Sequence, residues 1–82
     1  MSRYYLHIRC ESEFIEDDEG AEFVNLEDAR LEAVRSIRSL ASGDIQDGFL
    51  DMDQSIEIMG SDGGQLATVS FSDAITVRPA SS

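Results

Sequence analysis

Apolar residues recur at helical spacing in one stretch of the chain, and this feature constrains the fold most. At about 100° per residue, one face of residues 26–41 collects apolar side chains. They are Leu26, Ala29, Ala33, Val34, Ile37, Leu40 and Ala41. Asn25 can cap the helix start, and residues 42–43, Ser-Gly, offer an exit. A lone amphipathic helix must bury this face, so the rest of the chain has to supply a sheet.

Alternating residues on both sides of the helix predict that sheet. Residues 3–10 place Tyr4, Leu6, Ile8 and Cys10 on one side and Arg3, Tyr5, His7 and Arg9 on the other. We expect a short strand at 13–16 and a brief extended segment at 21–24. Residues 54–59 and 65–71 alternate again around the Gly-rich turn at 60–64. The predicted fold is α+β, in the order β-β-α-β-β, with an antiparallel sheet and one amphipathic helix packed on one face.

The 82 residues suffice for one small domain. We expect a single α+β domain over residues 1–77 and a frayed C-terminal tail over 78–82. The connector at 44–53 carries Ile45, Phe49 and Leu50, which we expect to pin it to the core. We expect Asp51 and Asp53 of this connector to lie on a solvated face that continues along the strand at 54–59.

The charge of the chain excludes several classes of partner. Seventeen acidic residues against six basic ones, all Arg, give a net charge of -11. Such a surface repels phosphate backbones and anionic lipids, so we expect no nucleic acid and no membrane partner. The single cysteine, Cys10, cannot form an intramolecular disulfide and suits a reducing compartment. Because the first residues also lack the apolar run of a secretory signal, we expect a cytoplasmic location.

Motifs that bind cofactors or perform catalysis are missing from the sequence. It contains no phosphate-binding glycine loop, dinucleotide-binding turn, nucleophile elbow or zinc-binding helix, so we assign no cofactor. His7 and Cys10 fall on opposite faces of one strand and cannot form a nucleophile and base pair. We assign no catalytic residue, and an enzymatic role ranks third among the hypotheses.

The densest run of charge is Glu16, Asp17, Asp18 and Glu19. Carboxylates in a loop are the ligands that calcium prefers, but the glycines here do not fall at the sixth position of a twelve-residue calcium loop. We assign no metal site and keep these four acids as the weaker candidates.

The leading functional hypothesis follows from the geometry of one helix on one sheet. The helix covers one face only, and the other face would carry Arg3, Tyr5, His7 and Arg9. We expect these residues to bind a partner, so the chain would be a non-enzymatic protein-interaction module that forms a homo-oligomer or binds another protein. Two alternatives are a cation-binding acidic domain and an acidic mimic of a phosphate lattice that occupies a basic protein.

Four short motifs, in this order, resemble a family of small bacterial proteins of unknown function. They are Arg3-Tyr4-Tyr5-Leu6-His7-Ile8-Arg9, Asp18-Glu19-Gly20, Leu26-Glu27-Asp28-Ala29-Arg30 with Glu32-Ala33, and Phe71-Ser72-Asp73-Ala74. The family usually continues after the first strand with Asp-Gly, which Cys10-Glu11 replaces here. The resemblance implies no activity. It singles out His7, Arg9, Asp18, Gly20, Arg30 and Asp73. For Arg30 we expect a salt bridge to the acidic loop, the segment that carries the charge run at residues 16–19.

Overall fold

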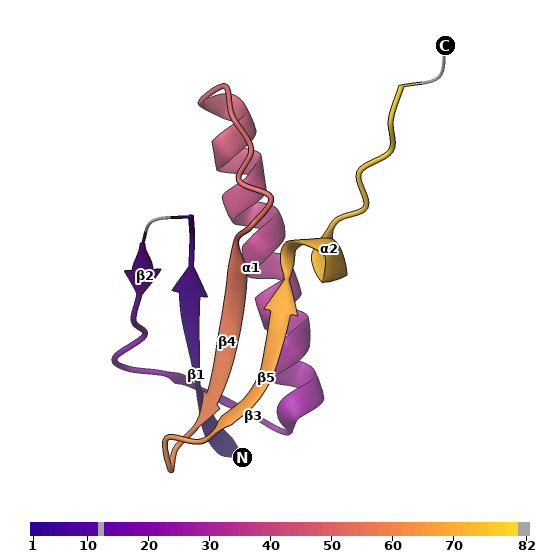
Figure 1. Cartoon of the computed structure of the whole chain (residues 1–82). Coiled ribbons are helices and arrows are strands. Elements are labelled where there is room, and N and C mark those ends of the chain that lie inside the picture. Colours follow the sequence, from indigo (N-terminus) through magenta and orange to yellow (C-terminus); the bar gives the residue numbers. More distant parts are fainter. Residues whose placement is uncertain (12, 81–82) are drawn as a thin grey trace.

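The computed structural model describes residues 1–11 and 13–80. Within them, five strands form an antiparallel sheet, and a long helix packs on one of its faces (Figure 1). The elements are β1 (Ser2–Arg9), β2 (Phe14–Ile15), β3 (Ala21–Phe23), α1 (Leu26–Gln46), β4 (Ser55–Gly60), β5 (Gln65–Ser70) and α2 (Phe71–Ala74). The α+β prediction is confirmed. No helix among the described residues is long and apolar enough to cross a membrane.

Strand β1 organises the sheet, because it uses both of its edges. One edge pairs with β4 from Tyr4 to Arg9. The other edge is divided: β3 pairs with residues 2–4 and β2 pairs with residues 8–9. The strands therefore lie in the order β2-β1-β4-β5, with β3 beside β2 on the outer edge of β1. The brief extended segment expected at 21–24 is thus a true strand.

The predicted apolar stripe of α1 forms one half of the core. Ala29, Ala33, Ile37 and Ala41 are buried, and they face Tyr4, Ile56, Ile58 and Val69 of the sheet. Three of the four buried helix residues are alanines, so the helix axis can approach the sheet closely. The larger side chains of the strands then fill the space between the layers.

Helix α1 does not end at residues 42–43 as the sequence suggested. It continues to Gln46, and Asp47 is its C-cap. Gly43 lies inside the helix, where a glycine costs only about 1 kcal/mol relative to alanine. The exit uses Gly48 instead, which has φ +91 and donates its N–H to the carbonyl of Ile45.

The connector after α1 is held by polar groups more than by apolar ones. Leu50 packs against the core as expected, but Ile45 and Phe49 are exposed, which corrects that prediction. Gln54 is buried, and its Nε2 donates to the carbonyl of Asp51 at 2.7 Å. The Asp51 carboxylate accepts the N–H groups of Glu11 and Asp53. Asp51 is therefore an internal acceptor and not part of a solvated face.

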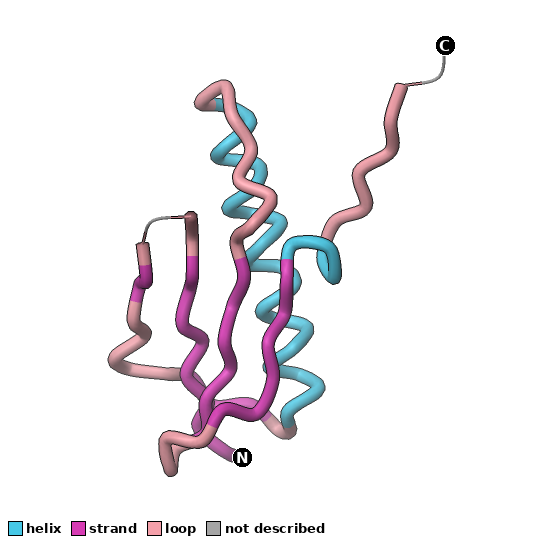
Figure 2. Tube along the Cα trace, viewed as in Figure 1, coloured by secondary structure: helices cyan, strands magenta, loops and turns pink. Residues whose placement is uncertain are grey.

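The end of the sheet also differs from the prediction. Residue 71 was expected to close the last strand, but Phe71 begins the short helix α2 (Figure 2). The Asp73 carboxylate accepts the N–H of Ser70 at 2.9 Å and so caps this helix. Residues 75–80 form no helix or strand, and the predicted fraying of 81–82 lies outside the described residues.

We predict that Ile37→Ala lowers the free energy of unfolding by about 2–5 kcal/mol, since it empties a fully buried position between α1 and the sheet. Leu31→Ala on the exposed side of α1 is the matched control and should change stability by less than about 1 kcal/mol. Urea denaturation followed by circular dichroism measures both. Equal losses would contradict the assignment of the core face.

Candidate functional site

Asp17 occupies the gap between the two strands that share the outer edge of β1. Neither β2 nor β3 pairs with Leu6, and the Asp17 carboxylate accepts the Leu6 N–H there at 3.1 Å. The other carboxylate oxygen accepts the N–H of Gly20 at 3.0 Å. In addition, the Asp17 N–H donates to Nδ1 of His7 at 2.9 Å. Asp17 thus supplies the hydrogen bond that a neighbouring strand would make at this position, and it fixes the orientation of the His7 ring.

Gly20 brings the same loop back onto β1. Its φ is +70, and a Cβ at this position would lie 2.9 Å from the Tyr4 carbonyl oxygen and 2.9 Å from Cε2 of Tyr5. Only glycine fits such a close approach without displacing the strand. The guanidinium of Arg3 donates to the carbonyl of Glu19 at 2.7 Å and also holds the loop against β1.

The electrostatic state of Asp17 follows from these contacts. Burial raises the pKa of its carboxyl group, but hydrogen bonds from the amides of Gly20, Leu6 and Glu19 outweigh burial. The net effect lowers the pKa of Asp17 below its ordinary value of 3.8. Asp17 is therefore ionised at neutral pH and acts as an acceptor only.

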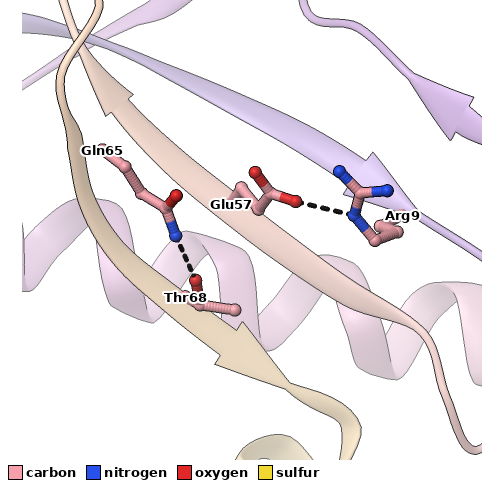
Figure 3. Close-up of polar contacts among 4 residues, drawn as sticks. All are labelled: Arg9, Glu57, Gln65 and Thr68. Carbon is pink, nitrogen blue, oxygen red and sulfur yellow. Dashed lines mark hydrogen bonds and ion pairs between the residues drawn. The ribbon is translucent and has the colours of Figure 1, made fainter.

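The sheet face opposite α1 carries a row of aromatic and charged side chains. Arg9 pairs with Glu57 of β4 through Nε at 2.7 Å, and its guanidinium lies 4.8 Å from the centre of the Phe14 ring. The rings of His7 and Phe14 are 5.5 Å apart. Figure 3 shows the Arg9–Glu57 pair and the Gln65–Thr68 hydrogen bond on this face, with the helix behind the sheet. We call it the uncovered face.

A cavity of about 250 Å³ opens between the uncovered face and the acidic loop. Tyr5, His7 and Met59 line it from the sheet. Glu16, Asp17 and Asp18 line it from the loop, and Gly60, Ser61 and Gly63 of the β4–β5 turn complete it. The cavity therefore combines aromatic and thioether walls with carboxylates on one side.

The structure divides the four predicted partner-binding residues. Tyr5 and His7 line the cavity, whereas Arg9 lies on the uncovered face but is already held by Glu57 and Phe14. Arg3 contacts the carbonyl of Glu19 in the acidic loop and does not line the cavity. Sequence reasoning missed Phe14 and Met59. Met59 could have been found, because it alternates with Ile58 and must face away from the helix.

The metal candidates have other tasks in the fold. Both Asp17 carboxylate oxygens accept backbone N–H groups, and Glu19 uses its carbonyl to bind Arg3. Glu16 and Asp18 line the cavity. Within residues 1–11 and 13–80, no group of three or more His, Cys, Asp or Glu side chains is arranged to hold a metal ion.

Cys10 lies away from the cavity and next to the acidic connector. Burial raises the pKa of its thiol, and the carboxylates of Asp51, Glu13 and Asp44 raise it further. The sulfur is therefore protonated at neutral pH and is a poor nucleophile.

Two residues singled out by the family resemblance, Arg30 and Asp73, act away from the cavity. The ion pairs found in the described residues are Arg9–Glu57 and Arg35–Glu32, so the salt bridge expected between Arg30 and the acidic loop is not formed. Hydrogen bonds from Ser70 lower the pKa of Asp73, and the charge of Arg30 adds to this effect. Asp73 therefore caps α2.

We predict that Gly20→Ala destabilises the chain by about 1–3 kcal/mol more than Gly63→Ala. Both glycines have positive φ, but a Cβ at Gly63 meets nothing within 4 Å. Comparison of the two variants therefore separates two contributions. Both variants place alanine at positive φ, which costs about 1 kcal/mol, and only Gly20→Ala adds the collision of the new Cβ with β1. Urea denaturation measures the difference, and equal losses would show that the close approach carries no energy.

We predict that Asp17→Asn lowers the free energy of unfolding by about 1–2 kcal/mol at pH 7, because the amide offers one acceptor oxygen in place of two. Asp18→Asn, its exposed neighbour, is the control and should be nearly neutral. Urea denaturation of the three proteins measures both differences.

The stability difference between the native chain and Asp17→Asn should also depend on pH. Because the folded pKa of Asp17 is lowered, its charge stabilises the fold fully above the unfolded pKa of about 4 and loses this effect as the pH falls toward the folded value. The stability difference between the native chain and Asp17→Asn should therefore narrow below about pH 4. A difference that is constant from pH 7 to pH 3 would rule out the charge as its source.

The comparisons with known proteins give a family and no function. No curated protein and no solved structure matches the chain. The family model that describes a domain of unknown function, DUF6894, matches residues 3–72, which include β1 except its first residue, β2 to β5 and the whole candidate site. The chain therefore belongs to the DUF6894 family.

Proposed function

We propose that this domain is a non-enzymatic protein-interaction module that binds a positively charged protein on its uncovered face. The observation that carries the proposal is the cavity between Tyr5, His7 and Met59 on one side and the acidic loop on the other. It lies on the sheet face that α1 does not cover. Its lining suits a side chain with an apolar stem and a cationic end.

The chemistry of the cavity selects arginine or lysine as the group that enters it. Tyr5 and Met59 offer an aromatic ring and a thioether against which a methylene stem packs, and a cation is attracted to a tyrosine ring. Glu16 and Asp18 can then receive the charged end. Asp17 is already engaged with backbone amides, so it contributes its charge and not a new hydrogen bond.

Charge favours the same class of partner at longer range. The chain has a net charge of -11, which accelerates the approach of a basic protein and repels nucleic acids and acidic proteins. Arg9 on the uncovered face is neutralised by Glu57 and does not oppose this attraction. We propose that the encounter takes place in the bacterial cytoplasm, which agrees with a lone protonated cysteine.

A peptide probe of defined charge tests the proposal directly. A short peptide of alternating arginine and glycine is titrated into the isotope-labelled domain, and the same peptide with citrulline in place of arginine is the uncharged control. We expect NMR shift changes at Tyr5, His7, Met59 and Gly60 with the arginine peptide only. Changes that spread evenly over the surface, or no changes, would contradict the proposal.

Double charge reversals distinguish binding at the cavity from a general attraction to the acidic surface. Glu16→Lys with Asp18→Lys should weaken binding of the arginine peptide at least about tenfold more than Asp47→Lys with Asp53→Lys. Both double variants change the net charge equally, but the residues of the second one do not line the cavity. Equal weakening would mean that diffuse attraction to an acidic surface, as in a mimic of phosphate, explains the binding.

A further inference from the structure

Strand β5 ends the sheet on the side away from β2 and β3. It pairs with β4 along one edge, and no other strand in the described part of the chain pairs with it. In an antiparallel sheet, alternate residues of such a strand direct their N–H and C=O groups outward. β5 therefore presents a row of backbone donors and acceptors at the end of the sheet (Figure 1).

This edge lacks the features that usually prevent two sheets from joining. Natural edges are kept short or carry charged residues or proline. On the opposite side of the sheet, β2 has two residues and β3 has three. β5 has six residues, Gln-Leu-Ala-Thr-Val-Ser, none of them charged and none of them proline. The irregularity in its pairing lies at its start, so Ala67–Ser70 follow a regular register.

The absence of charge on β5 points to a second copy of this chain as its partner. Two copies that each carry a charge of -11 repel each other over most of their surfaces, and a neutral edge is where they can approach at the lowest electrostatic cost. An antiparallel strand pair is also self-complementary about a two-fold axis. We propose that two copies pair antiparallel along β5 and form one continuous sheet.

The alternation of side chains limits the registers of this pairing to those in which the two-fold axis passes through a residue. Side chains of directly opposite residues must lie on the same face of the joined sheet. Thr68 lies on the uncovered face, because it is opposite Glu57, whereas Val69 is in the core. An axis through Thr68 satisfies this rule, with Thr68 opposite its own counterpart and Ala67 opposite Val69. Helix α2 follows Ser70 directly, so the ladder extends from Leu66 to Ser70.

The pairing is independent of the cavity proposed above. The cavity is built from β1, the acidic loop and the β4–β5 turn, and Thr68 does not line it. An axis perpendicular to the sheet keeps both uncovered faces on the same side. The dimer would then present two cavities to one partner and strengthen binding through avidity.

Sedimentation equilibrium over a concentration series tests the inference. We expect a monomer–dimer equilibrium in the native chain and a dimer dissociation constant at least about tenfold higher for Thr68→Lys, since two like charges would meet at the axis. Thr76→Lys, in the tail after α2, makes the same charge change and should leave the dimer intact. A native chain that stays monomeric at millimolar concentration, or a dimer insensitive to Thr68→Lys, would overturn the proposal.

A second variant reports the position of the contact and does not require the dimer dissociation constant to be measured. With Cys10→Ser as background, Thr68→Cys should form a disulfide-linked dimer under mild oxidation, and Thr76→Cys should not. Circular dichroism confirms that each variant is folded. Equal cross-linking at the two positions would contradict pairing at β5.

Discussion

The pairing of β1 on both edges is the constraint on which the rest of the structure depends. β4 pairs with one edge from Tyr4 to Arg9, and through β4 the strand β5 joins the sheet. The other edge is divided between β3 and β2, which leaves Leu6 without a strand partner on this edge. The Asp17 carboxylate completes this edge. The Asp17 side chain thus lets β2 and β3 share one edge of β1, and it holds the loop between them against the sheet.

This junction also creates the site. The loop that carries Asp17 bends at Gly20, where the backbone approaches Tyr4 and Tyr5 closely, and it then enters β3. Because the loop is fixed at both points, its acids stand at the border of the uncovered face and enclose a cavity with Tyr5, His7 and Met59. A free acidic loop would be a solvated run of charge. Here it becomes one wall of a cavity.

Local patterns predicted the layers of the fold but not the contacts that join distant segments. The stripe of α1 and the alternation of β1, β4 and β5 follow from residue spacing, and the buried residues agree with both. The role of Asp17 has no periodic signature, since its acceptors serve backbone groups eleven and three residues away. The family resemblance emphasised Asp18, which is exposed, while its neighbour makes the contacts. Likewise, Phe71 fits the alternation of β5, and only the cap made by Asp73 shows that it starts a helix.

The most direct test of this account is hydrogen exchange at the Leu6 amide, measured by NMR in the native chain. If the Asp17 carboxylate completes the edge of β1, the Leu6 N–H exchanges slowly, at a rate similar to those of the β1 amides paired with other strands, while the amide of exposed Asp18 exchanges fast. Fast exchange at Leu6, similar to that at Asp18, would show that this edge of β1 is open to water and would contradict the central claim.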